Sequence, residues 1–548
     1  MTFLRCVSAV MAAAVTISCC SCAAMNDSPP RISRYRDRES EYSIGQSVAD
    51  ENYEEADESD EEMLDSVQLV VKHFTEQLEK PQNEDRIQEN TEHLLDMLDG
   101  IYESRTFASV DFYSDYQNDE AMAAYQSSEH IYSVAEDLIS YAFYCGMQSQ
   151  YSELFTDIIP PEMAELYSDG TYDLETARAE AEAAYYDSSE DRNRYYEVIS
   201  DDTLSDDAKD LECAEILIDM LSDETPESFY ESYYRDYSGE DILALKDTVL
   251  SEVIPAYYAI EEAWHKTAPS GQYENDMLSE APFDVIRTYA KELSPDISRS
   301  ADRLIDEELF SISNNPDAFN IAFTDDLPTQ NSAYIFIGEK SRDNVLMTAV
   351  HEFGHFHASF YDDTHAYLMK NNYDIAEVQS HGMEILFTSF FDDIYGSDGD
   401  RNRLKTLADM CYYIFSAFYI GSFEYELVSR IDDITPEEVV RLYENSFSDY
   451  NIGYRLSDIS HLYECPGYYI SYATSGLASL QLFFDMRNDM DKALEKYEKI
   501  AKISCYSGEY TFRQALAECG FEDVLSKGYI TGISRKMREY AAEITAQT

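Results

Sequence analysis

The chain has 548 residues, of which 109 are acidic and 39 basic, so its formal net charge is −70. This excess of negative charge argues against binding to nucleic acid or to an anionic membrane surface; it would attract cationic peptides, or serve solubility alone. Hydrophobic residues make up 44% of the chain and aromatic residues 13%, which is enough for a large core and excludes an acidic disordered protein.

Residues 1–22 have the features of an export signal. Arg5 precedes an apolar stretch that is too short to span a membrane. Small residues then precede Cys19, Cys20 and Cys22, as in bacterial lipoproteins, whose first mature cysteine carries the lipid. Cys19 is the first candidate for lipidation, and a plain secretory leader is the alternative. We therefore expect the protein outside a bacterial cell, held on its surface by a lipid anchor or secreted.

Residues 23–63 are polar and then strongly acidic, so they cannot bury enough apolar surface to order themselves. We predict a disordered tether that holds the folded part off the membrane. Beyond the leader, six cysteines are too sparse for a disulfide scaffold, although one or two disulfides could form. None has zinc-finger spacing; they are Cys145, Cys213, Cys411, Cys465, Cys505 and Cys519.

Two helical regions follow the tether. Over residues 64–282, apolar residues recur at helical intervals and strand-like runs are few, which predicts a helical N-terminal lobe. Residues 283–548 form the second region, a C-terminal lobe that contains the candidate site described below. The clearest helical stretches are 65–78, 129–144, 176–186, 241–264, 409–429 and 491–503.

A short β-rich run at 332–338 is predicted to be a strand. At the edge of a sheet, its free backbone groups could bind an extended peptide by strand addition. Tyr334 and Phe336 would then be substrate-binding residues. An ordinary strand in a small sheet is the alternative.

His351-Glu352-Phe353-Gly354-His355 is an H-E-x-x-H motif within a predicted helix that has Ser341 as its candidate N-cap. On a helix, the two imidazoles lie on one face, one turn apart, and can bind a single zinc ion. Glu352 can then take a proton from a metal-activated water and pass it to a leaving amine. A buried helix with two hydrogen-bonded histidines is the alternative.

A catalytic zinc ion needs a third protein ligand, and candidates lie on the next predicted helix, residues 374–387. Glu377, His381 and Glu384 share one face of it, at spacings of four and three. One carboxylate could complete a His-His-Glu site, and another could accept the ring N–H of a ligand histidine. A solvated acidic face is less favoured, because the rest of this helix is apolar.

A segment dense in tyrosine, residues 461–476, offers hydroxyl donors for the negative charge that water attack builds on a carbonyl oxygen. Tyr469 and Tyr472 are the first candidates, followed by His461. Tyr463 and Tyr468 are candidates for substrate binding. Simple packing is the alternative for each tyrosine, since the chain has 46 of them.

The strand at 334–337, the motif helix through His357, and the run 376–380 with Glu384 together resemble the thimet oligopeptidase and oligoendopeptidase F family. The resemblance implies that His351, His355 and Glu377 bind one zinc ion and that Glu384 supports them. His381 stands where relatives usually carry another polar residue, so it could compete as a ligand or orient Glu377.

The tyrosine segment also resembles the family's C-terminal histidine and tyrosine segment, which contacts substrate and stabilises the tetrahedral intermediate. The resemblance implies a mainly α fold with two helical lobes around a deep channel and a small β-sheet beside the zinc helix. Such a channel would admit short or unfolded peptides and exclude folded proteins.

Together these features predict a zinc-dependent endopeptidase of the oligopeptidase type. Two alternatives stay open: a catalytically silent peptide-binding lipoprotein, and another glutamate-zincin such as a carboxypeptidase. The expected partners are peptide substrates and not nucleic acid. We expect the protein to be a monomer that contacts the membrane only through its lipid anchor.

Overall fold

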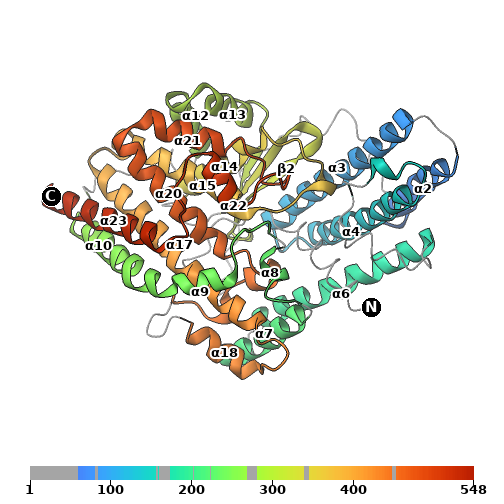
Figure 1. Ribbon diagram of the computed structural model, residues 1–548, viewed down its shortest axis with the longest axis horizontal. Coiled ribbons are helices and arrows are strands. Elements are labelled where there is room, and N and C mark those ends of the chain that lie inside the picture. Colours follow the sequence, from blue (N-terminus) through green and yellow to red (C-terminus); the bar gives the residue numbers. More distant parts are fainter. Residues whose placement is uncertain are drawn as a thin grey trace.

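A computed structural model describes most of the chain after the tether (Figure 1). The leader with Cys19, residues 23–59 and Ser341 lie outside the described residues. None of the described helices is both long and apolar enough to cross a membrane. The six later cysteines are all free thiols. The described residues are 60–80, 84–155, 158, 173–201, 203–222, 224–231, 233–267, 269, 281–338, 345–446 and 452–547.

The first helices form a bundle with a core of its own. Helices α2 (Asp60–Leu78), α3 (Glu84–Ser114) and α4 (Asp119–Met147) pack along one another, and α6 (Leu174–Ser200) packs on α4. Figure 1 shows this bundle, in blue and cyan, beside the larger body of the molecule. Its core consists mainly of leucine, valine, isoleucine, phenylalanine, alanine and tyrosine side chains from the inner faces of these helices, as their helical periodicity predicts.

The larger core joins the middle of the chain to its C-terminal half. Helices α7 (Asp206–Leu221), α9 (Gly239–Thr248) and α10 (Ile254–Lys266) contribute buried side chains to the same core as α17 (Gly399–Val428) and α20 (Ile470–Asn488). The buried side chains of these middle helices therefore share a core with the C-terminal helices, and the boundary of the two lobes near residue 282 stays a prediction.

The remaining helices cover this core. A π-helical turn, Val249–Val253, links α9 to α10. The C-terminal helix α23 packs against this turn and against α10. The described bounds of the other helices are α8 Ser228–Glu231, α12 Pro282–Leu293, α13 Pro295–Asp306, α16 Phe391–Tyr395, α18 Pro436–Glu444, α19 His461–Glu464, α21 Met490–Ile500, α22 Phe512–Glu518 and α23 Lys527–Gln547.

One small sheet lies between the bundle and the C-terminal helices (Figure 1). Its strands are β1 (Phe310–Ile312), β2 (Ala322–Leu327) and β3 (Ser332–Ile337), in the order β1-β3-β2. β3 pairs with β1 in parallel and with β2 antiparallel. The strand predicted at 332–338 is therefore confirmed. Of its two interpretations, the edge strand is wrong and the ordinary strand in a small sheet is confirmed, since β1 and β2 pair with both of its sides.

Two buried helices carry the motif residues. Helix α14 (Val345–Ser359) packs against α15 (Tyr373–Phe387), and α20 packs against α15 as well. Gly354 lets α14 and α15 approach, because a Cβ atom there would lie 2.7 Å from the carbonyl oxygen of Gln379 and from the Cα of Ser380. This close approach brings the histidines of the motif beside the acidic face of α15. The mainly α fold with a small sheet beside the motif helix is confirmed.

Candidate metal centre

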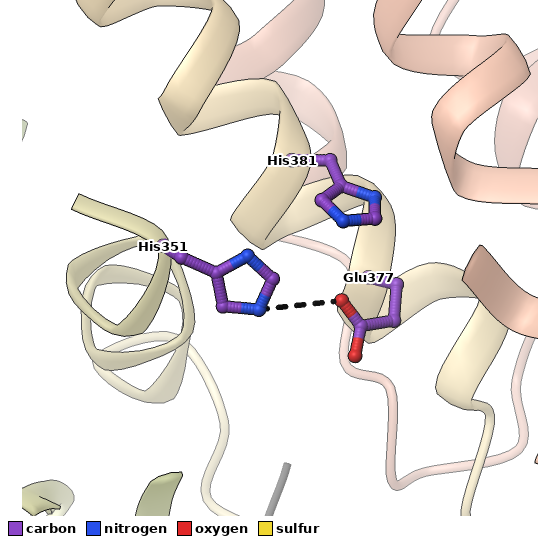
Figure 2. Close-up of side chains that lie close together, drawn as sticks. All are labelled: His351, Glu377 and His381. Atoms are coloured by element: carbon purple, nitrogen blue, oxygen red, sulfur yellow. Dashed lines mark ion pairs between the residues drawn. The ribbon is translucent and has the colours of Figure 1, made fainter. Parts of the chain in front are cut away.

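The two motif histidines lie on one face of α14, and both are buried. Their ring centroids are 5.1 Å apart. Nε2 of His351 lies 3.5 Å from Oε2 of Glu377 on α15, and Figure 2 shows the two side chains pointing toward each other. Nδ1 of His351 lies 2.7 Å from Oε1 of Glu384, so that carboxylate holds the outer side of the ring.

Glu377 is fully buried and held by two hydroxyl groups. Ser380 donates to Oε2 at 2.8 Å, and the Tyr468 hydroxyl donates to Oε1. Burial raises the pKa of Glu377, while His351 and the two hydroxyl groups act in the opposite direction. A cation bound beside it would favour the ionised carboxylate.

His381 joins this group from one turn further along α15 (Figure 2). The possible ligand atoms of His351, Glu377 and His381 all lie within 4.8 Å of one another. His355 falls outside this set of three, although its ring neighbours that of His351. It borders a cavity that Thr324 and Asp326 of β2 also line.

The donor atoms suit a zinc ion. The Nε2 atoms of His351, His355 and His381 are buried and have no hydrogen-bond partner. Burial lowers the pKa of His355 and of His381, which keeps both rings in the neutral form that binds metal. Burial also acts against a charge on His351, but the hydrogen bond to Glu384 and the charge of Glu377 raise its pKa to about 9. Glu384 and Glu377 therefore favour a positive charge at His351.

Glu352, the predicted base, is fully buried beside these ligands. The hydroxyl of Thr324 on β2 donates to its Oε2 at 2.8 Å, and this hydroxyl also lies 3.1 Å from the backbone oxygen of Glu352. Sequence reasoning missed Thr324, because strand β2 was not predicted. This contact fixes the sheet against the motif helix.

The tyrosine segment contacts the same site. The ring of His461 lies 5.5 Å from that of Tyr468, 5.4 Å from that of Tyr469 and 6.2 Å from that of Tyr472. The Tyr472 ring lies 6.0 Å from that of His381. The structure therefore places Tyr468 as a support for Glu377, with Tyr469 and Tyr472 beside it.

Three of the proposed substrate-binding side chains are packed against protein. Tyr463 stacks on Tyr195 of α6 at 4.0 Å. Phe336 is fully buried against Phe323, and the half-buried Tyr334 meets Phe107 edge to face at 5.5 Å. Their part in substrate binding stays a prediction, and packing is the contact that the structure describes.

A buried ion pair fixes the start of α15 to the tyrosine segment. Nε of Arg235 donates to Oδ2 of Asp374 at 2.8 Å, and both side chains are fully buried. The same guanidinium donates to the Gly467 carbonyl at 2.8 Å and to the Ser471 hydroxyl at 2.9 Å. Thr474 of α20 also donates to Asp374. Sequence reasoning missed this network, whose members are far apart along the chain.

Solved structures share this architecture. A protein assigned as an oligoendopeptidase F aligns over 91% of this chain and 99% of its own, with a TM-score of 0.68 and 14% identity. PZ peptidase A, solved with an inhibitor, aligns over 90% and 99%, with a TM-score of 0.67 and 12% identity. The chain has the oligoendopeptidase fold. A Bacillus anthracis protein that is also assigned as an oligoendopeptidase F aligns over 91% of this chain and 99% of its own, with a TM-score of 0.66 and 13% identity. A scan of protein-family models and a search of curated proteins gave no match.

Proposed function

We propose that this protein is a zinc-dependent endopeptidase of short or unfolded peptides and a member of the oligoendopeptidase family whose fold it shares. One observation carries the proposal. In that fold, His351, Glu352 and His355 of α14 stand against Glu377 of α15, with the His351 and Glu377 side chains 3.5 Å apart. Two histidines and one glutamate are the ligand set of many zinc peptidases.

His351, His355 and Glu377 would hold one zinc ion, with Glu384 fixing the ring of His351. The ion would supply two kinds of chemistry: it would polarise the scissile carbonyl and make a water molecule nucleophilic at neutral pH. The hydroxyls of Ser380 and Tyr468 would keep the Glu377 carboxylate in place, as the outer partners of metal ligands commonly do.

Glu352 would act as the general base and then as the general acid. Its carboxylate would accept the proton of the attacking water and return it to the nitrogen of the leaving amine. The hydroxyl of Thr324 holds Oε2 of this carboxylate at 2.8 Å, which restricts the rotation of the side chain. Tyr469, Tyr472 and His461 would donate to the oxygen on which negative charge develops.

The peptide would bind along β2. One side of this strand pairs with β3, and no described strand pairs with its other side. All six residues of β2 are buried, but Thr324, in the middle of the strand, contacts the proposed base and lines a cavity with His355, so a peptide that reached β2 through this cavity would lie beside the proposed metal ligands. Strand addition uses backbone groups and needs no chain terminus, which favours cuts inside a peptide over trimming from its end.

A cleavage map tests this proposal. Peptides of graded length would be incubated with the zinc-loaded protein, and the products identified by mass spectrometry. We expect internal cuts that stop when zinc is chelated and return when it is restored. Trimming from the C-terminus alone would instead identify a carboxypeptidase, and binding without any product would identify a silent peptide-binding protein.

The proposal includes a location outside a bacterial cell, on a lipid attached to Cys19. Its support is the leader in the sequence. Expression of the full chain in a bacterial host, followed by separation of membranes from medium, tests it. Cys19→Ala should release the protein from the membrane fraction, and the matched Cys20→Ala variant should stay in it. Retention of both variants would contradict lipidation at Cys19.

A further inference from the structure

His381 is fully buried on α15, and its orientation is set by a serine of α20. Its Nδ1 lies 2.9 Å from Oγ of Ser475. That hydroxyl donates its single hydrogen to the backbone oxygen of Ser471 at 2.6 Å. Oγ of Ser475 must therefore accept the bond from His381, which places the ring proton on Nδ1.

Nε2 of His381 then carries a lone pair and no hydrogen. The atom is buried and has no hydrogen-bond partner. The nearest carboxylate oxygen in an ion-pair contact, Oε1 of Glu384, is 4.0 Å away and already holds His351. A neutral imidazole with its Nδ1–H bonded and its Nε2 free is the form in which histidine binds a metal.

The surroundings of this nitrogen distinguish it from other buried histidines. His357 of α14 is also fully buried, with Nδ1 2.8 Å from a serine hydroxyl and with no partner for Nε2. Among the described residues, however, His357 belongs to no group of potential metal ligands, whereas His381 forms one with His351 and Glu377 (Figure 2). The position of His381, and not burial alone, points to a ligand.

We propose that Nε2 of His381 is a metal donor in addition to His351, His355 and Glu377. The inference rests on the proposed metal site and gives it three imidazoles and one carboxylate. Catalytic zinc sites usually have three protein ligands and one position for water. With a fourth protein donor, the water of the proposed reaction would take a fifth position, to which catalytic zinc sites can expand. The site should also hold zinc more tightly than a site that lacks His381.

X-ray absorption of the zinc-loaded, unmodified protein tests the ligand count directly. Imidazole rings give a characteristic scattering pattern, from which their number around zinc is fitted. Three imidazoles are expected. Two imidazoles would overturn the assignment of His381 and leave the proposed function intact, whereas a protein that binds no zinc would overturn the proposed function itself.

Two substitutions separate the ligand from its support. The nitrogen of the amide in His381→Asn can replace Nδ1 at Ser475, but nothing replaces Nε2; we expect two imidazoles and a loss of zinc affinity of about 100-fold or more. Ser475→Ala keeps Nε2, so three imidazoles should remain and the loss should be about 10-fold, within the range for outer partners of metal ligands.

His357→Asn is the matched control, because it removes a buried, serine-bound histidine outside the ligand group. It should bind zinc like the unmodified protein, in a chelator-competition titration at one pH. Unchanged affinity in His381→Asn would overturn the proposal. Circular dichroism checks that each variant is folded, and if His381→Asn does not fold, the imidazole count of the unmodified protein decides.

Discussion

The helices around the candidate metal centre and those of the N-terminal bundle differ in the side chains that they bury. Helices α14 and α15 bury charged side chains as well as apolar ones, and α20 buries uncharged polar ones. Several of these buried side chains bond to partners on other elements, as Glu352 does to Thr324 and His381 to Ser475. The bundle of α2, α3 and α4 has a mostly apolar core. Burying a polar group costs free energy unless it is paired.

Two buried charged groups of the bundle lie where it meets the rest of the chain. Asp99 of α3 accepts from the backbone N–H of Ala366 at 2.7 Å and contacts His365. Arg105 of α3 lies 3.8 Å from Asp325 of β2. At Asp99 and Arg105, buried charge joins two parts of the molecule, whereas around α14 and α15 it forms the candidate site. Each of the following substitutions removes an interaction from one of these two regions.

The largest effect is expected from Glu352→Gln. The amide cannot accept the proton of the attacking water, so kcat/KM should fall by about 100- to 10,000-fold, the range for loss of a general base. Zinc content should stay the same, since Glu352 is not a proposed ligand. Cleavage of an internally quenched peptide, with zinc measured on the same sample, checks both.

Glu136→Gln is the matched control in the bundle. Glu136 is also buried, and burial raises its pKa to about 8. Its carboxylate accepts from Tyr132 on the same helix, so the neutral amide should be tolerated and activity should stay within about 2-fold. Equal losses in both variants would mean that Glu352 matters only for packing.

Arg235→Met should cause the largest loss of stability. It leaves the fully buried carboxylate of Asp374 without its cation, which costs about 3–5 kcal/mol when one partner of a buried pair is removed. Arg105→Met is the matched change in α3, where the carboxylates of Glu129 and Asp325 lie at 3.4 and 3.8 Å and the loss should be smaller. Urea unfolding of both variants measures the difference, and the reverse order would contradict it.

Glu384→Gln should weaken zinc binding by about 10- to 100-fold, because the carboxylate that orients His351 is lost. Asp99→Asn breaks a histidine–carboxylate pair of the same length, 2.7 Å, in the bundle, and it should leave zinc affinity unchanged. Chelator competition compares the two variants. Equal affinities would show that Glu384 has no part in the metal site.

The smallest effect concerns the pH dependence of the contact between His365 and Asp99. The hydrogen bond to Asp99 raises the pKa of His365 from 6.5 to about 9. The stabilisation is therefore complete below pH 6.5 and is lost as the pH rises through 9. After solvent screening we expect it to be about 1 kcal/mol. His365→Gln should lower the urea midpoint at pH 6 and have little effect at pH 10; an equal loss at both would contradict a charged pair.

Local sequence patterns predicted the elements of the site well. The helix around His351 and His355, the following helix with Glu377, and the strand at 332–338 all formed where apolar periodicity placed them. In each of these segments the pattern of apolar residues lies within a single helix or strand. Residues close together in the sequence are therefore enough to predict that element. The same holds for most of the helical stretches predicted in the two lobes.

Contacts between distant segments were not predictable in this way. β1 has only three residues, and its parallel pairing made β3 a central strand instead of an edge strand. Arg235 and Asp374 are separated by 139 residues, and Ser475 reaches His381 from another helix. No local periodicity reports which residues of separate elements meet in the fold.

A zinc titration of activity tests the central claim most directly. Protein freed of metal would receive zinc in steps, while cleavage of an internally quenched peptide is followed and the products are identified. We expect no cleavage at the start, a linear rise, and a break at one zinc per chain, with cuts inside the peptide. Full activity before zinc is added, or no cleavage at any zinc content, would contradict the account.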